Sequence, residues 1–240
     1  MENSMGILVQ RHAFGHNKMK KIILVISFAV VVIVFLTAFY RGTLEPELFQ
    51  LPIINPEDVP PALVDGKYSE NTVNHQIPEF TFQDQSGKWI SRNEVAGKIS
   101  IVNFFFTTCP VVCPTLTRSL LKVQDAYLND NRVVILSHTV FPEYDTAVVL
   151  EDYGKQYGVT PGKWHLLTGD KNELYAIARK GYFAVNKQSD GDFIHTENFV
   201  LVDWNHRIRG IYNGTSAFSV NQLIEDIRIL LSEMKRDVKV

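Results

Sequence analysis

Two cysteines, Cys109 and Cys113, are the only ones in the 240 residues of the chain, and they stand four residues apart. A secreted module held together by disulfides would need more cysteines at wider spacing. Thiolates bind soft metals such as Cu(I), Zn(II) and iron–sulfur units, and a pair of thiols can exchange with a disulfide. The pair therefore indicates chemistry. The structural alternative is a small local disulfide in a compartment outside the cytoplasm.

The spacing Cys-x-x-x-Cys is one residue longer than the redox spacing Cys-x-x-Cys. Positions i and i+4 share one face of a helix, so both sulfurs can point at one centre if the loop is helix-like. A nearby helix N-terminus and access to solvent would lower the thiol pKa and favour thiolates. Two sulfurs are too few for a closed metal site, so a metal would need a third ligand from elsewhere in the chain.

The run Ile99–Phe106 is almost entirely apolar, which is typical of a central strand buried on both faces. A helix opened by Pro114 follows it. The two cysteines lie directly after this strand, and open α/β sheets bind ligands at the carboxyl ends of their parallel strands. The sequence therefore places the pair at the functional edge of a predicted sheet.

Two histidines are candidates for the third ligand. His195 precedes the predicted antiparallel strand Phe199–Val202, and His138 follows the predicted parallel strand Val133–Leu136. An antiparallel strand begins at the edge where parallel strands end, so both imidazoles are expected near the cysteines. His206, in the next turn, is expected at the opposite edge. A lone histidine in a loop is more often solvated than a ligand, but imidazole is a common partner of thiolates around such metals.

The remaining pattern predicts one α/β domain over residues 78–240. Its order is a β-hairpin, then β, α, β, α, β, α, then two antiparallel strands and a closing helix, which is the thioredoxin-like arrangement with an added N-terminal β-hairpin. The predicted strands are Phe80–Gln83, Lys88–Ser91, Ile99–Phe106, Val133–Leu136, Trp164–Leu167, Phe199–Val202 and Ile208–Tyr212, and the predicted helices are Pro114–Tyr127, Thr146–Tyr157, Lys171–Arg179 and Ser219–Met234.

The composition is globular: 45% of residues are hydrophobic, 21% are charged, and the formal net charge is −2. A disordered chain would be poorer in apolar residues. The near-neutral balance argues against a broad face that binds nucleic acid.

A membrane anchor is predicted near the N-terminus. Residues 22–40 are nineteen residues without a charge, about the length that a bilayer core requires. Basic residues precede this run, so residues 1–21 are expected in the cytoplasm and the rest outside it. A cleaved signal peptide is disfavoured because Tyr40 is too large for a cleavage site. The interpretation is a single-pass protein of a bacterial inner membrane, with a Pro-rich linker over residues 41–77 and a periplasmic domain. Met19 is an alternative start of the chain to Met1.

Several segments together resemble the Sco (SenC) proteins, which are membrane-anchored copper proteins with a thioredoxin fold. Phe104–Pro114 resembles the cysteine signature of that family, and Trp164–Asp170 and Phe193–Asp203 resemble later segments of it. Ser137 with Pro142–Thr146 resembles the segment after the next strand. The similarity covers residues 78–235, which is nearly the whole predicted domain.

The resemblance implies that Cys109, Cys113 and His195 bind one copper ion, as Cu(I), Cu(II) or both. It also implies assembly of the dinuclear copper centre of cytochrome c oxidase, by metal delivery, by reduction of that centre's cysteines, or by both. The expected partners are the copper-bearing subunit of the oxidase and, beyond it, other copper carriers or thiol reductants. Val111 and Thr108 depart from the Asp and His that family members often carry there, and Ile194 replaces a common Asp.

Two enzyme classes compete with this copper chaperone. A periplasmic thiol–disulfide oxidoreductase would use Cys109 and Cys113 as its catalytic redox pair. Such proteins usually place a cis-proline opposite the cysteines, whereas His195 and its neighbours stand there and no proline follows Pro161. A peroxiredoxin-like peroxidase would need a proline where Val102 stands. The missing prolines favour a metal-binding chaperone over an enzyme.

Overall fold

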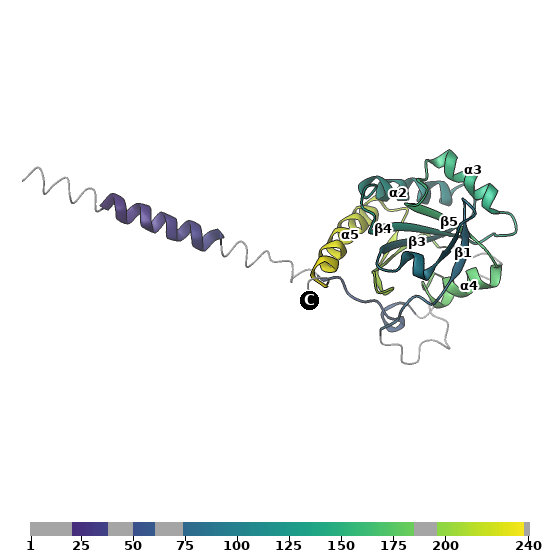
Figure 1. Cartoon of the computed structure of the whole chain (residues 1–240), viewed down its shortest axis with the longest axis horizontal. Coiled ribbons are helices and arrows are strands. Elements are labelled where there is room, and N and C mark those ends of the chain that lie inside the picture. The colour runs from purple at the N-terminus through teal and green to yellow at the C-terminus, as the bar shows by residue number, and fades with distance from the viewer. Residues whose placement is uncertain (1–20, 38–49, 61–73, 185–195, 238–240) are drawn as a thin grey trace, which may run out of the picture. The chain divides into compact units, whose positions relative to one another are not determined.

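The computed structural model describes residues 21–37, 50–60, 74–184 and 196–237 (Figure 1). Residues Gln50–Val240 form one compact unit, and Met1–Phe49 form another. In the unit Met1–Phe49, residues 21–37 are helical and their apolar side chains are exposed. Within the described part of the chain, no helix is both long enough and apolar enough to cross a membrane.

A seven-stranded mixed sheet is the centre of the domain, with the strand order β2-β1-β5-β4-β3-β6-β7. β3 pairs in parallel with β4, and β4 pairs in parallel with β5. β6 runs antiparallel to β3. The strands are β1 (Thr81–Asp84), β2 (Trp89–Ser91), β3 (Ile99–Phe105), β4 (Val133–Thr139), β5 (Trp164–Thr168), β6 (Asn198–Val202) and β7 (Ile208–Asn213). This is the predicted order, including the added N-terminal hairpin.

Helices cover both faces of this sheet (Figure 1). They are α2 (Val112–Ala126), α3 (Ala147–Tyr157), α4 (Lys171–Lys180) and α5 (Ala217–Asp237), with the short turns η2 (Pro56–Asp58) and η4 (Arg92–Val95). One core layer lies under α4 and includes Phe104. The other lies under α2, α3 and α5 and includes Phe105 and Cys113. Because helices cover both faces, all seven residues of β3 are buried, which explains its unbroken apolar sequence.

Several element boundaries differ by a few residues from the prediction, and two of these differences bear on the site. α2 begins at Val112, before Pro114, because the missing N–H of a proline is tolerated in the first turn of a helix. Cys113 is therefore a helical residue. β4 continues to Thr139, so His138 is a strand residue and does not follow the strand.

Part of the predicted linker, residues 51–54, lies against the domain. The N–H of Ile54 donates to the carbonyl of Ile208 at 2.8 Å. The N–H of Leu51 donates to the carboxylate of Glu233 at 2.9 Å. Arg209 donates to the carbonyls of Leu51 and Pro52. These contacts hold residues 51–54 on β7 and α5, so the structured domain begins well before residue 78.

Candidate metal centre

Cys109 and Cys113 stand where β3 ends and α2 begins. The N–H of Cys109 donates to the carbonyl of Phe106 at 3.3 Å, which turns the chain after the strand. The N–H of Cys113 then donates to the sulfur of Cys109 at 3.4 Å. Both cysteines are free thiols; Cys109 is partly exposed and Cys113 is buried. One turn at the helix N-terminus thus brings the two residues together, as their spacing predicts.

The surroundings of the two thiols push their pKa values in opposite directions. Partial burial raises the pKa of Cys109, but hydrogen bonds from Cys113 and from the backbone N–H groups of Val111 and Val112 outweigh it and bring the pKa below its ordinary value. Burial, with neighbouring Cys109 and the charge of Asp145, raises the pKa of Cys113 to about 12. Cys109 is therefore the thiol that ionises first and reacts first.

A buried carboxylate positions the loop that carries Cys109. Asp145 accepts the backbone N–H of Thr107 at 3.2 Å and also accepts the hydroxyl of Thr107. It accepts the hydroxyl of Thr139 as well, at the end of β4. Asp145 therefore ties the end of one parallel strand to the cysteine loop that follows the other.

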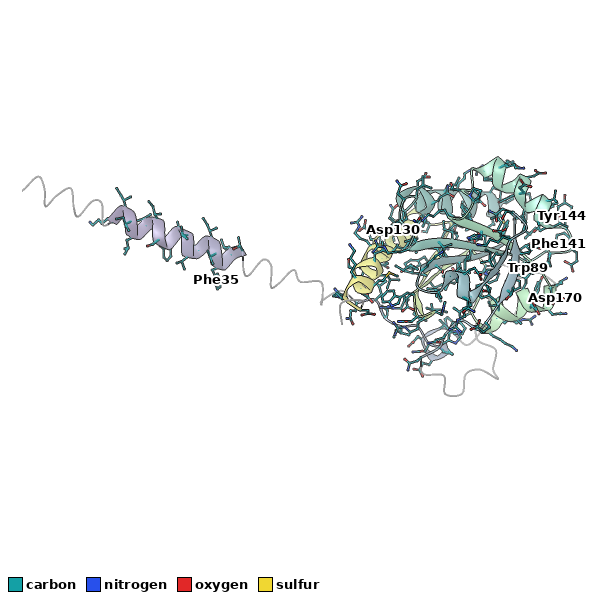
Figure 2. All side chains as sticks on the ribbon, viewed as in Figure 1. Phe35, Trp89, Asp130, Phe141, Tyr144 and Asp170 are labelled. Atoms are coloured by element: carbon teal, nitrogen blue, oxygen red, sulfur yellow. The ribbon has the colours of Figure 1, made fainter. Side chains whose placement is uncertain are left out.

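The sequence pattern alone assigned no role to Asp145. A usable signal was its place directly before Thr146, the N-cap of α3, because that position lies at the same sheet edge as the cysteines. In the same loop the rings of Phe141 and Tyr144 stack with centroids 5.8 Å apart, and both side chains lie at the margin of the domain (Figure 2).

A cavity of about 380 Å³ opens beside the cysteines. Thr196 and Glu197, which directly follow His195, line it together with Cys109 and Cys113. The carbonyl of Glu197 accepts the N–H of Gly214 at 2.7 Å, which holds this segment at the edge. The rest of the lining is Phe104, Phe105, Phe106, Pro110, Val111, Val112 and Leu116. The antiparallel strand thus begins at the cysteine edge, as predicted.

His195 itself lies outside the described residues. Among the residues that the structure does describe, no group of three or more His, Cys, Asp or Glu side chains could hold a metal ion. The described part of the site therefore supplies two sulfur donors. The assignment of His195 as the third ligand stays a prediction.

His138 is not near the cysteines, which corrects the prediction for it. It is fully buried in β4, paired with Phe104 of β3, on the face of the sheet opposite Cys113. Its imidazole packs against the rings of Phe80, Phe82, Phe104 and Tyr182. Neither ring nitrogen has a hydrogen-bond partner among the described residues. Burial lowers the pKa of His138 to about 3, so the imidazole is neutral at physiological pH.

The other described histidines also lie away from the site. His206 is in the turn between β6 and β7, at the opposite edge of the sheet, as predicted. His165 shares a hydrogen bond of 2.8 Å with Asp84, and His75 shares one of 2.8 Å with the carbonyl of Gly181. These contacts account for both side chains structurally.

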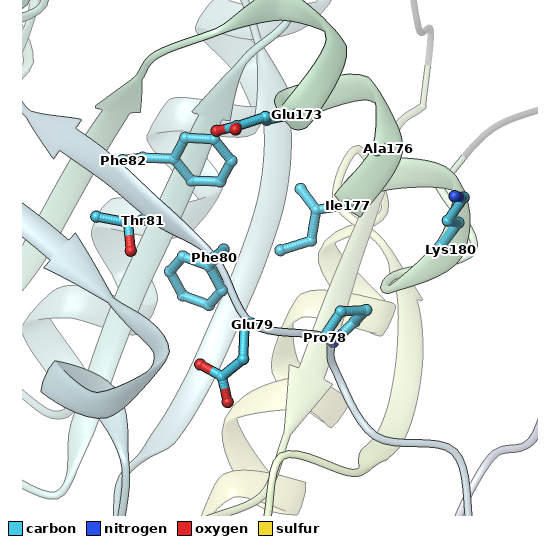
Figure 3. A pocket seen from close by; sticks show the side chains of 9 residues that line it. All are labelled: Pro78, Glu79, Phe80, Thr81, Phe82, Glu173, Ala176, Ile177 and Lys180. Atoms are coloured by element: carbon cyan, nitrogen blue, oxygen red, sulfur yellow. The ribbon is translucent and has the colours of Figure 1, made fainter.

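A second cavity of about 380 Å³ lies between β1 and α4 (Figure 3). Phe80, Phe82 and Ile177 form its apolar wall, and Glu79, Glu173 and Lys180 also line it. It contains neither a sulfur nor an imidazole among its described lining residues. Of these two cavities, the one beside Cys109 is therefore the one whose described lining contains sulfur donors.

Comparison with known proteins agrees with this geometry. A family model described as SCO1/SenC matches residues 69–232. The chain belongs to the SCO1/SenC family. Cys109, Cys113 and His195 all lie within the part of the chain that matches the SCO1/SenC model.

Individual SCO1/SenC relatives cover most of the domain. A SCO1 protein homolog of Bacillus subtilis (strain 168) is 29% identical over 167 residues, which are 68% of this chain and 86% of the relative. The structure is similar to that of BsSco, described as a member of the Sco family of cytochrome c oxidase assembly proteins with a disulfide switch, at a TM-score of 0.57, 28% identity and coverage of 67% and 96%. It is also similar to Bradyrhizobium japonicum ScoI with copper bound, at a TM-score of 0.53, 26% identity and coverage of 64% and 98%.

Proposed function

We propose that this protein binds copper through Cys109, Cys113 and His195 and transfers it to the dinuclear copper centre of cytochrome c oxidase. One observation carries the proposal: a single cavity brings both cysteines together with Thr196, the residue that follows His195. Two thiolates and an imidazole are a donor set that suits Cu(I). The copper-bound structure of ScoI, a relative over the same domain, supports copper as the metal.

The difference between the two thiols supports an ordered transfer. Cys109 is partly exposed and has the lower pKa, whereas Cys113 is buried in the first turn of α2. A thiolate of the acceptor can approach copper from the side of Cys109 and replace that ligand first. Cys113 then leaves last, from the protected side. Three protein ligands leave an open position for this exchange.

The same thiol pair supports a second candidate function, reduction of a partner's disulfide. The Cys109 thiolate would attack one partner sulfur, form a mixed disulfide and release the other sulfur as a thiolate. Cys113 would then lose its proton and attack the Cys109 sulfur, leaving a Cys109–Cys113 disulfide and a partner with two thiols. The observation that favours this step is the low pKa of an accessible Cys109 beside a protected Cys113. The disulfide would also remove both sulfur ligands, so oxidation would release copper.

The location is part of the proposal. Residues 22–40 anchor the protein in a bacterial inner membrane, residues 1–21 remain in the cytoplasm, and the thioredoxin-like domain, including residues 78–240, lies in the periplasm. The uncharged run and the basic residues before it support this arrangement.

Metal analysis of the purified, reduced full chain tests the copper assignment. We expect one copper per chain, and loss of copper in both Cys109→Ser and His195→Ala. His206→Ala is the matched control, because His206 lies at the opposite edge of the sheet, and it should keep its copper. Full copper loading in His195→Ala would overturn the ligand assignment. Normal oxidase assembly in a strain that lacks the protein would overturn the role.

A further inference from the structure

A polar cavity of about 630 Å³ lies at the edge of the sheet opposite the cysteines, beside the turn between β6 and β7. Its described lining comes from three parts of the chain: that turn, the first residue of η4, and the segment before β1. The N–H of Ile77 donates to the carbonyl of His206 at 2.8 Å, which joins the segment before β1 to the turn. Two guanidinium groups, those of Arg92 and Arg207, belong to the lining. The proposed copper chemistry makes no use of this cavity.

A buried carboxylate holds Arg207 in place. The Nε of Arg207 donates to one carboxylate oxygen of Asp203 at 2.9 Å, and its Nη2 lies 2.8 Å from the same oxygen. Asp203 is fully buried and is also paired with Arg209 at 3.1 Å. A guanidinium group has five N–H donors, and among the described residues the Nη1 group of Arg207 has no acceptor. Arg207 can therefore donate to a ligand while it keeps its pairing with Asp203.

Arg92 is paired less firmly than Arg207. Its Nη1 donates to the carboxylate of Glu79 at 2.7 Å, and its Nη2 donates to the side-chain oxygen of Gln76 at 3.1 Å. Its Nε is buried and has no hydrogen-bond partner among the described residues, which is costly for a charged group. The side chain of Glu79 is 70% exposed, and ion pairs at the surface contribute little to stability. A bound anion can therefore compete with Glu79 for the guanidinium group of Arg92.

The backbone beside this cavity has an uncommon conformation at two positions. Asn74 and His206 both line the cavity and have φ angles of 67° and 62°. In the described part of the chain, Phe183 is the one other non-glycine residue with a positive φ. Asn and His adopt this left-handed conformation more readily than most residues, and residues held in it are concentrated at functional sites. The backbone therefore agrees with a ligand site at this edge.

We propose that this cavity binds a phosphate group through the guanidinium groups of Arg92 and Arg207. Guanidinium N–H groups bind phosphate oxygens in pairs, and a phosphate has enough oxygens to bind two guanidinium groups at once, whereas a carboxylate has only two oxygens. The cavity is larger than a phosphate ion and Trp204 also lines it, so the ligand carries an organic group beside the phosphate. A soluble phosphate monoester and the phosphodiester headgroup of a phospholipid share this chemistry.

Calorimetric titration of the metal-free full chain, in a non-ionic detergent, tests the site and separates these two sources. The ligands are inorganic phosphate, glycerol 3-phosphate as the monoester and glycerophosphoglycerol as the headgroup, with glycerol as the uncharged control. We expect a dissociation constant of about 1 mM for the preferred phosphate compound and no binding of glycerol. Tighter binding of glycerol 3-phosphate would identify a soluble monoester, and tighter binding of glycerophosphoglycerol a headgroup. If none of the three phosphate compounds saturates the protein below about 10 mM, the site is overturned.

Two arginine substitutions locate the bound phosphate. Arg92→Gln and Arg207→Gln should each weaken binding about tenfold, because each removes charge-assisted hydrogen bonds. In Arg207→Gln the buried carboxylate of Asp203 keeps Arg209 as its partner. Arg132→Gln is the matched control, because Arg132 is also a partly exposed arginine paired with an aspartate but is not among the lining residues, and it should leave binding unchanged. Affinity equal to that of the parent in Arg92→Gln and in Arg207→Gln would overturn the proposal.

A third variant, Glu79→Gln, should improve binding. It removes the negative charge that competes for Arg92 and leaves the guanidinium group in place. We therefore expect the preferred phosphate compound to bind several-fold more tightly, which partial unfolding of the variant would not produce. Unchanged or weaker binding in Glu79→Gln would contradict the role of Arg92 in the site.

Discussion

The carboxylate of Asp145 accepts both the backbone N–H and the hydroxyl of Thr107, two residues before Cys109. Asp145 is fully buried and also accepts the hydroxyl of Thr139. Hydrogen bonds to a buried charge are stronger than neutral ones and fix geometry. The position of the first sulfur therefore depends on a residue that follows a different strand of the sheet.

Replacing this carboxylate tests that dependence. In Asp145→Asn the amide can accept fewer hydrogen bonds and carries no charge, so we expect unfolding free energy to fall by about 1–3 kcal/mol. Copper should bind more weakly, because the loop that holds Cys109 loses its fixed position. Chemical denaturation and competition with a copper chelator measure the two effects. Asp152→Asn, an exposed change on α3, is the control and should alter neither. Wild-type copper affinity in Asp145→Asn would contradict a positioning role.

The two thiols should alkylate at different pH. The lowered pKa of Cys109 makes it a thiolate at lower pH than an ordinary cysteine, whereas Cys113, with a pKa of about 12, stays protonated through neutral pH. At pH 8, Cys109 in Cys113→Ser should react with iodoacetamide at least about tenfold faster than Cys113 in Cys109→Ser. Mass spectrometry after timed quenching gives the rates. Urea-unfolded samples of each variant give the reference rate of an unprotected thiol. Equal rates in the two folded variants would contradict the difference in pKa between the two thiols.

Acid should destabilise the domain through His138. Its pKa is about 3 in the folded protein and near 6.5 when unfolded, so the unfolded chain binds a proton first as the pH falls. The resulting loss of stability begins near pH 6.5 and grows by up to about 1.4 kcal/mol per pH unit. His138→Phe removes the titrating imidazole, so the unfolding free energy should fall less steeply as the pH is lowered. Urea titrations at pH 7, 6 and 5 measure this. Phe104→Leu, in the same core layer, is the control and should lower the unfolding free energy equally at each pH. If the unfolding free energy of His138→Phe depended on pH as steeply as that of the parent protein, this mechanism would be ruled out.

We expect Arg209 to hold residues 51–54, which precede β1, against β7 and α5. It forms buried ion pairs with Asp203 at 3.1 Å and Glu233 at 2.8 Å and donates to the carbonyl of Leu51. Arg209→Met leaves Glu233 without its buried partner, so we expect a loss of about 3–5 kcal/mol in unfolding free energy. Limited proteolysis should then cut near residues 50–54. Arg228→Met removes an exposed pair with Glu225 and should cost less than about 1 kcal/mol.

Much of the site could be predicted because local rules determine it. The apolar run of β3, the helix after it and the spacing of Cys109 and Cys113 predict a pair at the carboxyl edge of the sheet. The direction of β6 predicts that the chain around residue 196 reaches the same edge. These inferences need only the periodicities of strands and helices and the directions of consecutive strands.

Other features depend on which side of a strand a residue faces and on partners far along the chain. His138 has a register partner in Phe104, and that register places its side chain opposite the cysteines. A pattern of seven buried residues on β4 gives no alternation from which its face could be read. Nothing local indicates that residues 51–54 lie on β7 and α5, because their partners Ile208 and Glu233 are far along the chain.

The sequence by itself determined the order of the elements, the spacing of the two thiols and the edge at which they lie, because these follow from period, composition and chain direction. The tertiary structure alone decided which thiol is exposed, which carboxylate holds the loop and which face His138 occupies. Burial and hydrogen bonding depend on neighbours brought together from distant parts of the chain, such as Asp145 beside Thr107. The difference in pKa between Cys109 and Cys113 also depends on folding, which buries Cys113 and leaves Cys109 partly exposed beside the backbone N–H groups of Val111 and Val112.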